Sequence, residues 1–104
     1  MTNTYQIIFW RDIPVQVKVR SAGQRINRQL SARFQEAIDE AAMRARTTST
    51  EDYLEEWHAS EWQSGEGEAE QLADSMAAQL ESDYPPERLK ALVINRGYEP
   101  AAAD

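Results

Sequence analysis

The only histidine of the chain, His58, is the first residue to consider for chemistry, because an imidazole can bind a metal or act as a general base. It lies three residues after Glu55, and one Glu-x-x-His motif is half of what a di-iron helix bundle takes from two of its helices. With no cysteine and no second histidine, a transition-metal site would depend almost wholly on carboxylates. We therefore interpret His58 as a surface residue of an acidic helix and expect neither a metal nor another cofactor.

The sequence lacks the other residue patterns that are typical of catalysis. It has no Gly-x-Ser-x-Gly nucleophile elbow, and Ser60 lies beside His58 in or near a predicted helix, without a strained turn. Its four glycines form no phosphate loop, since Gly65-Glu66-Gly67 lacks a lysine and its glutamate would repel phosphate. The acidic residues between positions 51 and 70 do not have the spacing of a calcium-binding EF-hand loop. We expect a protein that is not an enzyme.

Basic residues gather where a predicted strand meets the first predicted helix. Arginines in the first turn of a helix oppose its dipole, so a bound anion, a partner's carboxylates or ion pairs with the acidic second half must compensate. We expect the ion pairs and keep anion or nucleic-acid docking as an alternative. A pI of about 4.7 and the absence of basic-aromatic interleaving argue against nucleic acid. The patch, called the 18–33 patch below, comprises Lys18, Arg20, Arg25, Arg28 and Arg33.

Aromatic residues form the second group of binding candidates, because tryptophan anchors both protein interfaces and small cores. Tyr53 and Trp57 are four residues apart on one face of a predicted helix, and Trp62 follows near its end. We expect at least two of the three tryptophans to be core residues. The candidate interaction residues are Trp10, Arg11, Asp12, Arg25, Arg28, Tyr53, Trp57 and Trp62.

These residues are positioned by a predicted β-hairpin with strands at residues 5–10 and 15–20. The second strand alternates valines with polar residues, which predicts one wet face, and Pro14 suits its start. The first strand is apolar on both faces, so it needs helices, a third strand or a partner as cover. We expect Phe9 to face the long helix and Trp10 to project to the other side of the sheet, where this chain or another would bury it.

Apolar residues at three- and four-residue intervals predict a long helix from about residue 24 to about residue 46. Ser49, three residues before Asp52, predicts the start of a second helix, and residues 63–67 are predicted to be a loop. A third helix carries Leu72 and Leu80, and a last helix ends at Gly97. The predicted order is β-β-α-α-α-α, an α+β fold in which the hairpin packs on the long amphipathic helix, followed by about three shorter helices.

The bulk composition predicts one domain over residues 1–100, with a frayed tail at 101–104. The net charge of −7 is uneven: residues 1–46 hold eight Arg/Lys and four Asp/Glu, whereas the rest holds three and fourteen. No apolar run approaches the roughly 20 residues that cross a bilayer, and no cationic-then-apolar leader begins the chain. We expect a cytoplasmic protein, with which the absence of cysteine agrees.

Four stretches, IIFWRDIPVQV, RQLSARFQEAIDEAAMRA, YLEEW and RGYEP, together resemble a family of small bacterial proteins labelled "virulence factor". The family is related to a domain of the staphylococcal-type conserved virulence factor C. The resemblance spans nearly the whole chain, is densest in the first half, and leaves residues 64–70 as the variable part. It brings no catalytic motif, so Trp10, Arg11, Asp12 and Pro14 transfer only as its signature.

The leading functional hypothesis is a non-enzymatic protein–protein interaction module, acting as a homodimer or as an accessory subunit of a protein partner. The resemblance also implies an alternative, an accessory or small ligand-binding protein linked to one-carbon (folate or corrinoid) methyl transfer. A further alternative, from a different class, is a small enzyme or ligand-binding protein that uses Arg11, Asp12 and His58 in a cleft.

Overall fold

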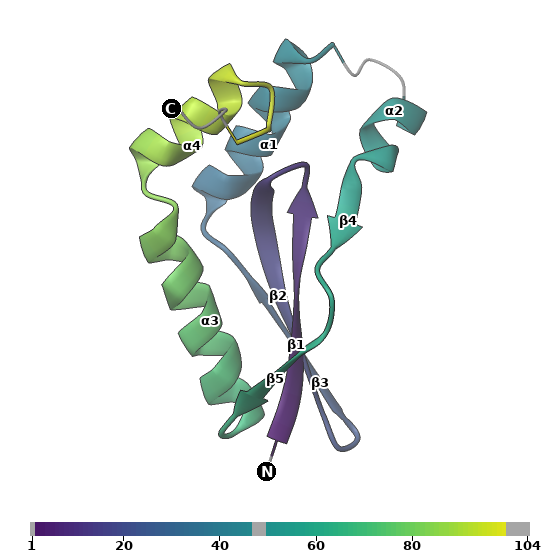
Figure 1. The fold of residues 1–104 in the computed structure, drawn as a ribbon, viewed down its shortest axis with the longest axis vertical. Helices are drawn as coiled ribbons and strands as arrows, with labels where there is room; N and C mark the ends of the chain where they lie inside the picture. The colour runs from purple at the N-terminus through teal and green to yellow at the C-terminus, as the bar shows by residue number, and fades with distance from the viewer. Residues whose placement is uncertain (1, 47–49, 100–104) are drawn as a thin grey trace, which may run out of the picture.

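Five strands and four helices follow the order βββααββαα in the computed structural model, which describes residues 2–46 and 50–99 (Figure 1). The α+β class and the N-terminal hairpin are therefore confirmed, and three further strands are present. The elements are β1 (Thr2–Trp10), β2 (Ile13–Ser21), β3 (Gln24–Gln29), α1 (Ala32–Arg44), α2 (Thr50–Glu55), β4 (Trp57–Ala59), β5 (Gln63–Glu66), α3 (Ala69–Asp83) and α4 (Pro86–Ile94).

The sheet is antiparallel and β1 is its centre. Strand β2 pairs with one edge of β1, while β4 and β5 divide the other edge between them, β4 at the hairpin tip and β5 near the N-terminus. Strand β3 extends the sheet beyond β2. Both edges of β1 are thus paired within the chain, whereas the apolar residues on its two faces, Tyr5, Ile7, Ile8 and Phe9, are only half-buried.

The prediction of a long helix is wrong for the first third of its range, because residues 24–29 form β3. A two-residue turn at Ala22 and Gly23, with Gly23 at a φ of 72°, reverses the chain after β2. Ile26 then pairs with Val19 across the sheet and is buried with it. The four-residue spacing from Ile26 to Leu30 fits one face of a helix and, because four is even, one face of a strand as well.

The remaining differences lie between residues 50 and 66. Helix α2 ends at Glu55, so Trp57 and His58 belong to β4 and not to its helical face. Residues 63–66 form β5, where a loop was expected, because they complete the edge of β1. The cap predicted at Ser49 and the tail predicted at 101–104 lie outside the described residues.

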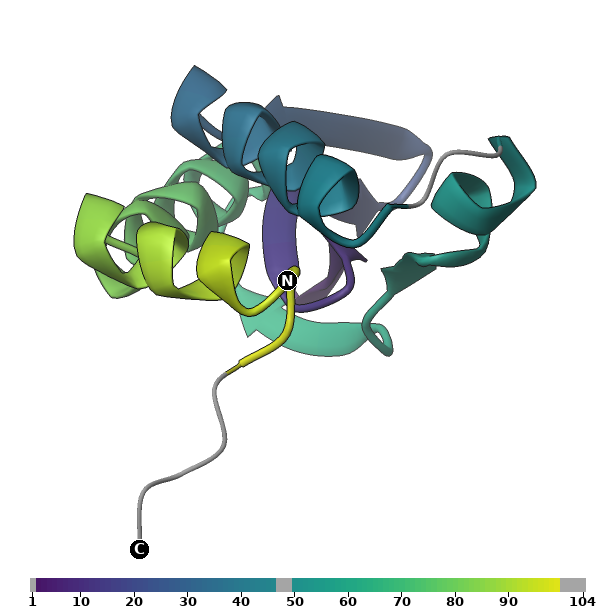
Figure 2. The ribbon, with the colours of Figure 1, turned by 90° about the horizontal axis from the view of Figure 1, so that it is seen from above.

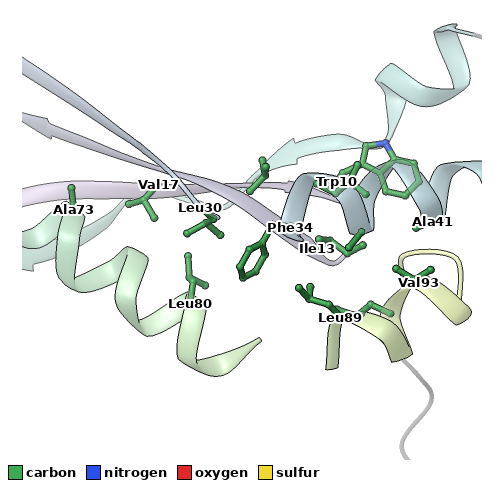
Figure 3. Packing of buried hydrophobic residues seen from close by; sticks show 14 of the residues in the cluster. Trp10, Ile13, Val17, Leu30, Phe34, Ala41, Ala73, Leu80, Leu89 and Val93 are labelled. Carbon is green, nitrogen blue, oxygen red and sulfur yellow. The ribbon is translucent and has the colours of Figure 1, made fainter. Parts of the chain in front are cut away.

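The core lies between the sheet and three helices. Helix α3 packs along β2 and β3, and α1 packs against both β2 and α4 (Figures 1 and 2). Strand β2 contributes Val15, Val17 and Val19 to this core, and α1 contributes Phe34 and Ile38. Val17 and Phe34 are labelled among the packed side chains in Figure 3. No helix among the described residues is long and apolar enough to span a membrane.

Trp10 and Phe9 have the reverse of their expected roles. Trp10 is 0% exposed and belongs to the core, whereas Phe9 is only half-buried. The pairing of β1 with β2 shifts between Ile8 and Phe9, which places a bulge just before the hairpin tip. Because a bulge bends and twists a strand, the residues beyond it need not keep the alternation of those before it.

We expect Phe34→Ala to destabilise the fold by about 3–5 kcal/mol, because Phe34 is fully buried and its removal leaves a cavity. Urea unfolding followed by circular dichroism measures the change. Leu54→Ala, at an exposed position of α2, is the control and should change stability by less than about 0.5 kcal/mol. Equal effects of the two substitutions would contradict this placement of the core.

Candidate functional site

The tip of the β1–β2 hairpin is held by two segments that are far from it in sequence. Arg11, in the left-handed region at a φ of 53°, donates its backbone N–H to the carbonyl of Glu56 at 3.0 Å. The backbone N–H of Asp12 donates to the carbonyl of Gly97 at 2.8 Å. The tip therefore joins the α2–β4 junction to the turn that follows α4.

The side chain of Arg11 extends these contacts. Its Nη1 donates to the carbonyl of Arg96 at 2.7 Å, and its Nη2 donates to a carboxylate oxygen of Glu56 at 3.3 Å. The guanidinium carbon lies 4.9 Å from the ring centroid of Trp10 and 4.6 Å from that of Tyr98, within the range of cation–π attraction. With its side chain only 11% exposed, Arg11 is committed to the fold.

Trp10 is fixed on the other side of this cluster. Its indole Nε1 donates to the carbonyl of Tyr53 at 3.0 Å, and the two rings lie 5.8 Å apart. Tyr53 also meets Trp57 edge-on at 6.0 Å. Trp10 is buried and Trp57 packs against the core, which confirms that at least two of the three tryptophans are structural.

Arg11, Asp12 and His58 do converge, as a site formed by these three residues would require. They line a small hollow of about 180 Å³ together with Phe9, Tyr84 and Glu99. However, Asp12 accepts a hydrogen bond from the backbone of Glu99 at 2.7 Å, and the Nε2 of His58 lies 2.5 Å from the carbonyl of Arg11. Since a carbonyl can only accept, this nitrogen must carry a proton.

The other contacts of this hollow are also structural. The imidazole of His58 stacks on the ring of Phe9, with 5.5 Å between the two ring centroids. Burial raises the pKa of the Tyr84 phenol above its ordinary value of 10.0. Within residues 2–46 and 50–99, no group of three or more His, Cys, Asp or Glu side chains is arranged to hold a metal ion. Most polar groups of the hollow therefore have partners within the chain, whereas the buried Nε of Arg11 has none among the described residues.

The cations of the 18–33 patch lie on two different sides of the sheet. Arg28 and Arg33 pair with acidic residues of α3, Arg28 with Asp74 at 2.8 Å and Arg33 with Glu81 at 3.1 Å. The hydrogen bond to Asp74 raises the pKa of the Arg28 guanidinium. The expected ion pairs with the acidic second half of the chain are confirmed for these two arginines. The expectation is wrong for Lys18, Arg20 and Arg25, which have no ion-pair partner among the described residues.

The other three cations of the patch surround a hollow of about 370 Å³, which we call the basic hollow. It lies on the face of β1, β2 and β3 that carries polar side chains, where Lys18 stands opposite Asn27 and Arg20 stands opposite Arg25. Trp62, which is 39% exposed, forms one side, and the guanidinium carbon of Arg20 lies 4.5 Å from its ring centroid. Its lining residues are Gln6, Lys18, Val19, Arg20, Arg25, Asn27 and Trp62.

The sequence predicted the cations and the tryptophan of the basic hollow as binding candidates, but it did not predict that they lie together. The alternation of Lys18 and Arg20 in a predicted strand indicated a shared polar face. Trp62 could not be joined to them, because the pairing of β5 with β1 brings it there from more than forty residues away. The interleaving of basic and aromatic groups that the sequence lacks is thus created by the fold.

Comparison with known proteins supports the family that the sequence resembles. A profile of the family described as "Virulence factor" matches residues 8–93, and the chain belongs to this family. The matched range contains the hairpin tip and every lining residue of the basic hollow except Gln6, and it ends before the Arg96–Glu99 turn that holds the tip. No curated protein and no solved structure matches the chain.

We expect Gly97→Ala to destabilise the protein more than Gly67→Ala. Both glycines have left-handed φ values, 95° and 98°, so alanine costs about 1–3 kcal/mol of strain at either position. A Cβ at Gly97 would also lie 2.8 Å from the indole of Trp10, whereas one at Gly67 meets nothing within 4 Å. The extra cost at Gly97 should be about 1–3 kcal/mol by urea unfolding. Equal costs would show that the tip is not tightly packed.

Proposed function

We propose that this member of the virulence factor family is a non-catalytic binding module that docks an acidic segment of a partner protein in the basic hollow. The observation that carries the proposal is the presence of Lys18, Arg20 and Arg25 together on one sheet face with no ion-pair partner among the described residues. Their two neighbours in the 18–33 patch, in contrast, are both paired.

The arrangement of these charges favours an anionic occupant. Arg20 and Arg25 are direct cross-strand partners, and like charges that stand opposite one another destabilise a sheet. A carboxylate placed between the two guanidinium groups would relieve this repulsion and accept hydrogen bonds from both. The free protein thus tolerates a small electrostatic cost that binding removes.

Trp62 supplies the apolar anchor that charge alone lacks. Tryptophan and arginine dominate the binding energy of protein interfaces, and here Arg20 lies against the Trp62 ring. The neighbouring amides of Gln6 and Asn27 add hydrogen-bonding groups to the same hollow. Polar groups around one exposed aromatic ring are typical of a peptide-binding surface.

An acidic protein segment fits this surface better than nucleic acid. Apart from the three cations of the hollow, the chain carries eight Arg/Lys against eighteen Asp/Glu. This surrounding charge repels a long polyanion over distances comparable with the Debye length, whereas a short acidic segment places only a few charges near it. The proposal of a non-catalytic role is supported by the hairpin tip, where Arg11, Asp12 and His58 each have a side-chain contact with a backbone atom.

Selection of displayed twelve-residue peptides tests the proposal. Peptides enriched on the wild-type protein should be rich in Asp and Glu and should be lost when the target is the double variant Arg20→Glu/Arg25→Glu. Fluorescence anisotropy with one enriched peptide should show binding weakened at least ten-fold, about 1.4 kcal/mol, because two attractive charges become repulsive.

The matched control is Arg46→Glu/Arg96→Glu, which changes the net charge equally at exposed sites outside the hollow. It should bind the peptide nearly as well as the wild type. Enriched peptides without excess acidic residues would contradict the proposal, and so would equal losses in both variants. Tighter binding of a single-stranded oligonucleotide than of the peptide would instead assign the hollow to nucleic acid.

A further inference from the structure

A second surface, independent of the basic hollow, lies between α1 and α4. These helices run side by side in the same direction in both views (Figures 1 and 2). Between them is a groove of about 360 Å³ whose apolar lining is Ala37, Pro86, Leu89, Val93 and Ile94. The other five lining residues of the groove carry charged groups.

The exposure of Ile94 on this surface is not explained by packing within the chain. Helix α4 buries Leu89, Leu92 and Val93 in the core of its own chain, whereas Ile94 is 59% exposed at the end of the helix. A large exposed aliphatic side chain beside an apolar groove favours an interface, because covering both removes apolar surface from water.

The rims of the groove carry charges of opposite sign. On the α1 side, the side chain of Glu36 has no hydrogen bond or ion pair with another described residue. On the α4 side, the same is true of the side chain of Lys90. The other charged groups on the rim have partners within the chain. Arg33 binds Glu81 at 3.1 Å, and Glu40 and Arg44 face each other at 3.9 Å.

We infer that the α1–α4 groove binds the same groove of a second copy of this chain across a two-fold axis. In such an interface each contact occurs twice, so Glu36 of each copy faces Lys90 of the other. Ile94 of each copy then covers the apolar groove of its partner. A foreign helix that carried only one sign of charge would meet at least one rim of its own sign, which is why a copy of the same surface fits best.

This dimer would leave the basic hollow free, because the hollow lies on the polar face of the sheet and the groove lies between two helices. Two hollows in one particle would allow bivalent binding of a partner with two acidic segments. The dimer itself does not depend on the proposed function, so either can fail without the other.

Light scattering on the eluate of a sizing column tests the inference. The wild type should approach twice the mass of the 11.9 kDa chain as its concentration rises. Ile94→Glu should remain a monomer, because it places a charge in the apolar contact. Leu54→Glu, at an exposed site on α2 outside the groove, should dimerise like the wild type.

A charge swap distinguishes a second copy from any other occupant. Glu36→Lys and Lys90→Glu should each weaken self-association, since each places like charges together twice. An equimolar mixture of the two variants should dimerise again, because a dimer with one copy of each variant pairs opposite charges in both of its contacts. Circular dichroism checks that the variants, altered at exposed and unpaired sites, keep the wild-type fold.

Three results would overturn the inference. They are a wild type that stays monomeric at every concentration, a dimer that persists unchanged in Ile94→Glu, and a mixture of the charge variants that associates no better than either alone. The last result, with a dimeric wild type, would place the dimer contact on another surface. Peptide binding to the basic hollow should be unaffected by Ile94→Glu, so a failure here leaves the proposed function to its own test.

Discussion

The rest of the structure depends on the contacts that the buried guanidinium of Arg11 makes. Burying a charged group is costly unless hydrogen bonds and an opposite charge compensate, and Arg11 obtains these from the backbone of Arg96 and the carboxylate of Glu56. Its faces are covered by Trp10 and Tyr98. One side chain thus connects the hairpin, the α2–β4 junction and the turn after α4, three segments that local interactions would leave independent.

The sheet then determines which of the other arginines are available to a partner. Because successive side chains of a strand point to opposite faces, Arg28 meets the acidic helix α3 while Arg25 points to the polar face of the sheet. Charges of one patch in the sequence are therefore separated by the alternation of β3. Arg28 is paired with α3, whereas Arg25 has no ion-pair partner among the described residues and can take part in the binding that we propose.

The two proposed binding functions use different surfaces of the molecule, one formed by helices and the other by the sheet. The α1–α4 groove is apolar with charges of both signs at its rims, which suits self-association. The basic hollow is polar with one exposed indole, which suits a reversible contact with a charged segment. Neither surface uses the cluster around Arg11, whose groups are occupied by the fold. Trp10, Arg11 and Asp12 at the hairpin tip are in this view required for folding.

The sequence alone determined the hairpin, the α+β class and the later helices, because these follow from local periodicity. The excess of acidic residues in the second half predicted ion pairs for the whole 18–33 patch, but only the tertiary structure decided that Arg28 and Arg33 are the cations that are paired. It could not determine β3, since a four-residue spacing of apolar residues fits a strand as well as a helix. Only the tertiary structure buried Trp10 and brought Trp62 to Arg20, because both depend on pairing between strands that are distant in the chain.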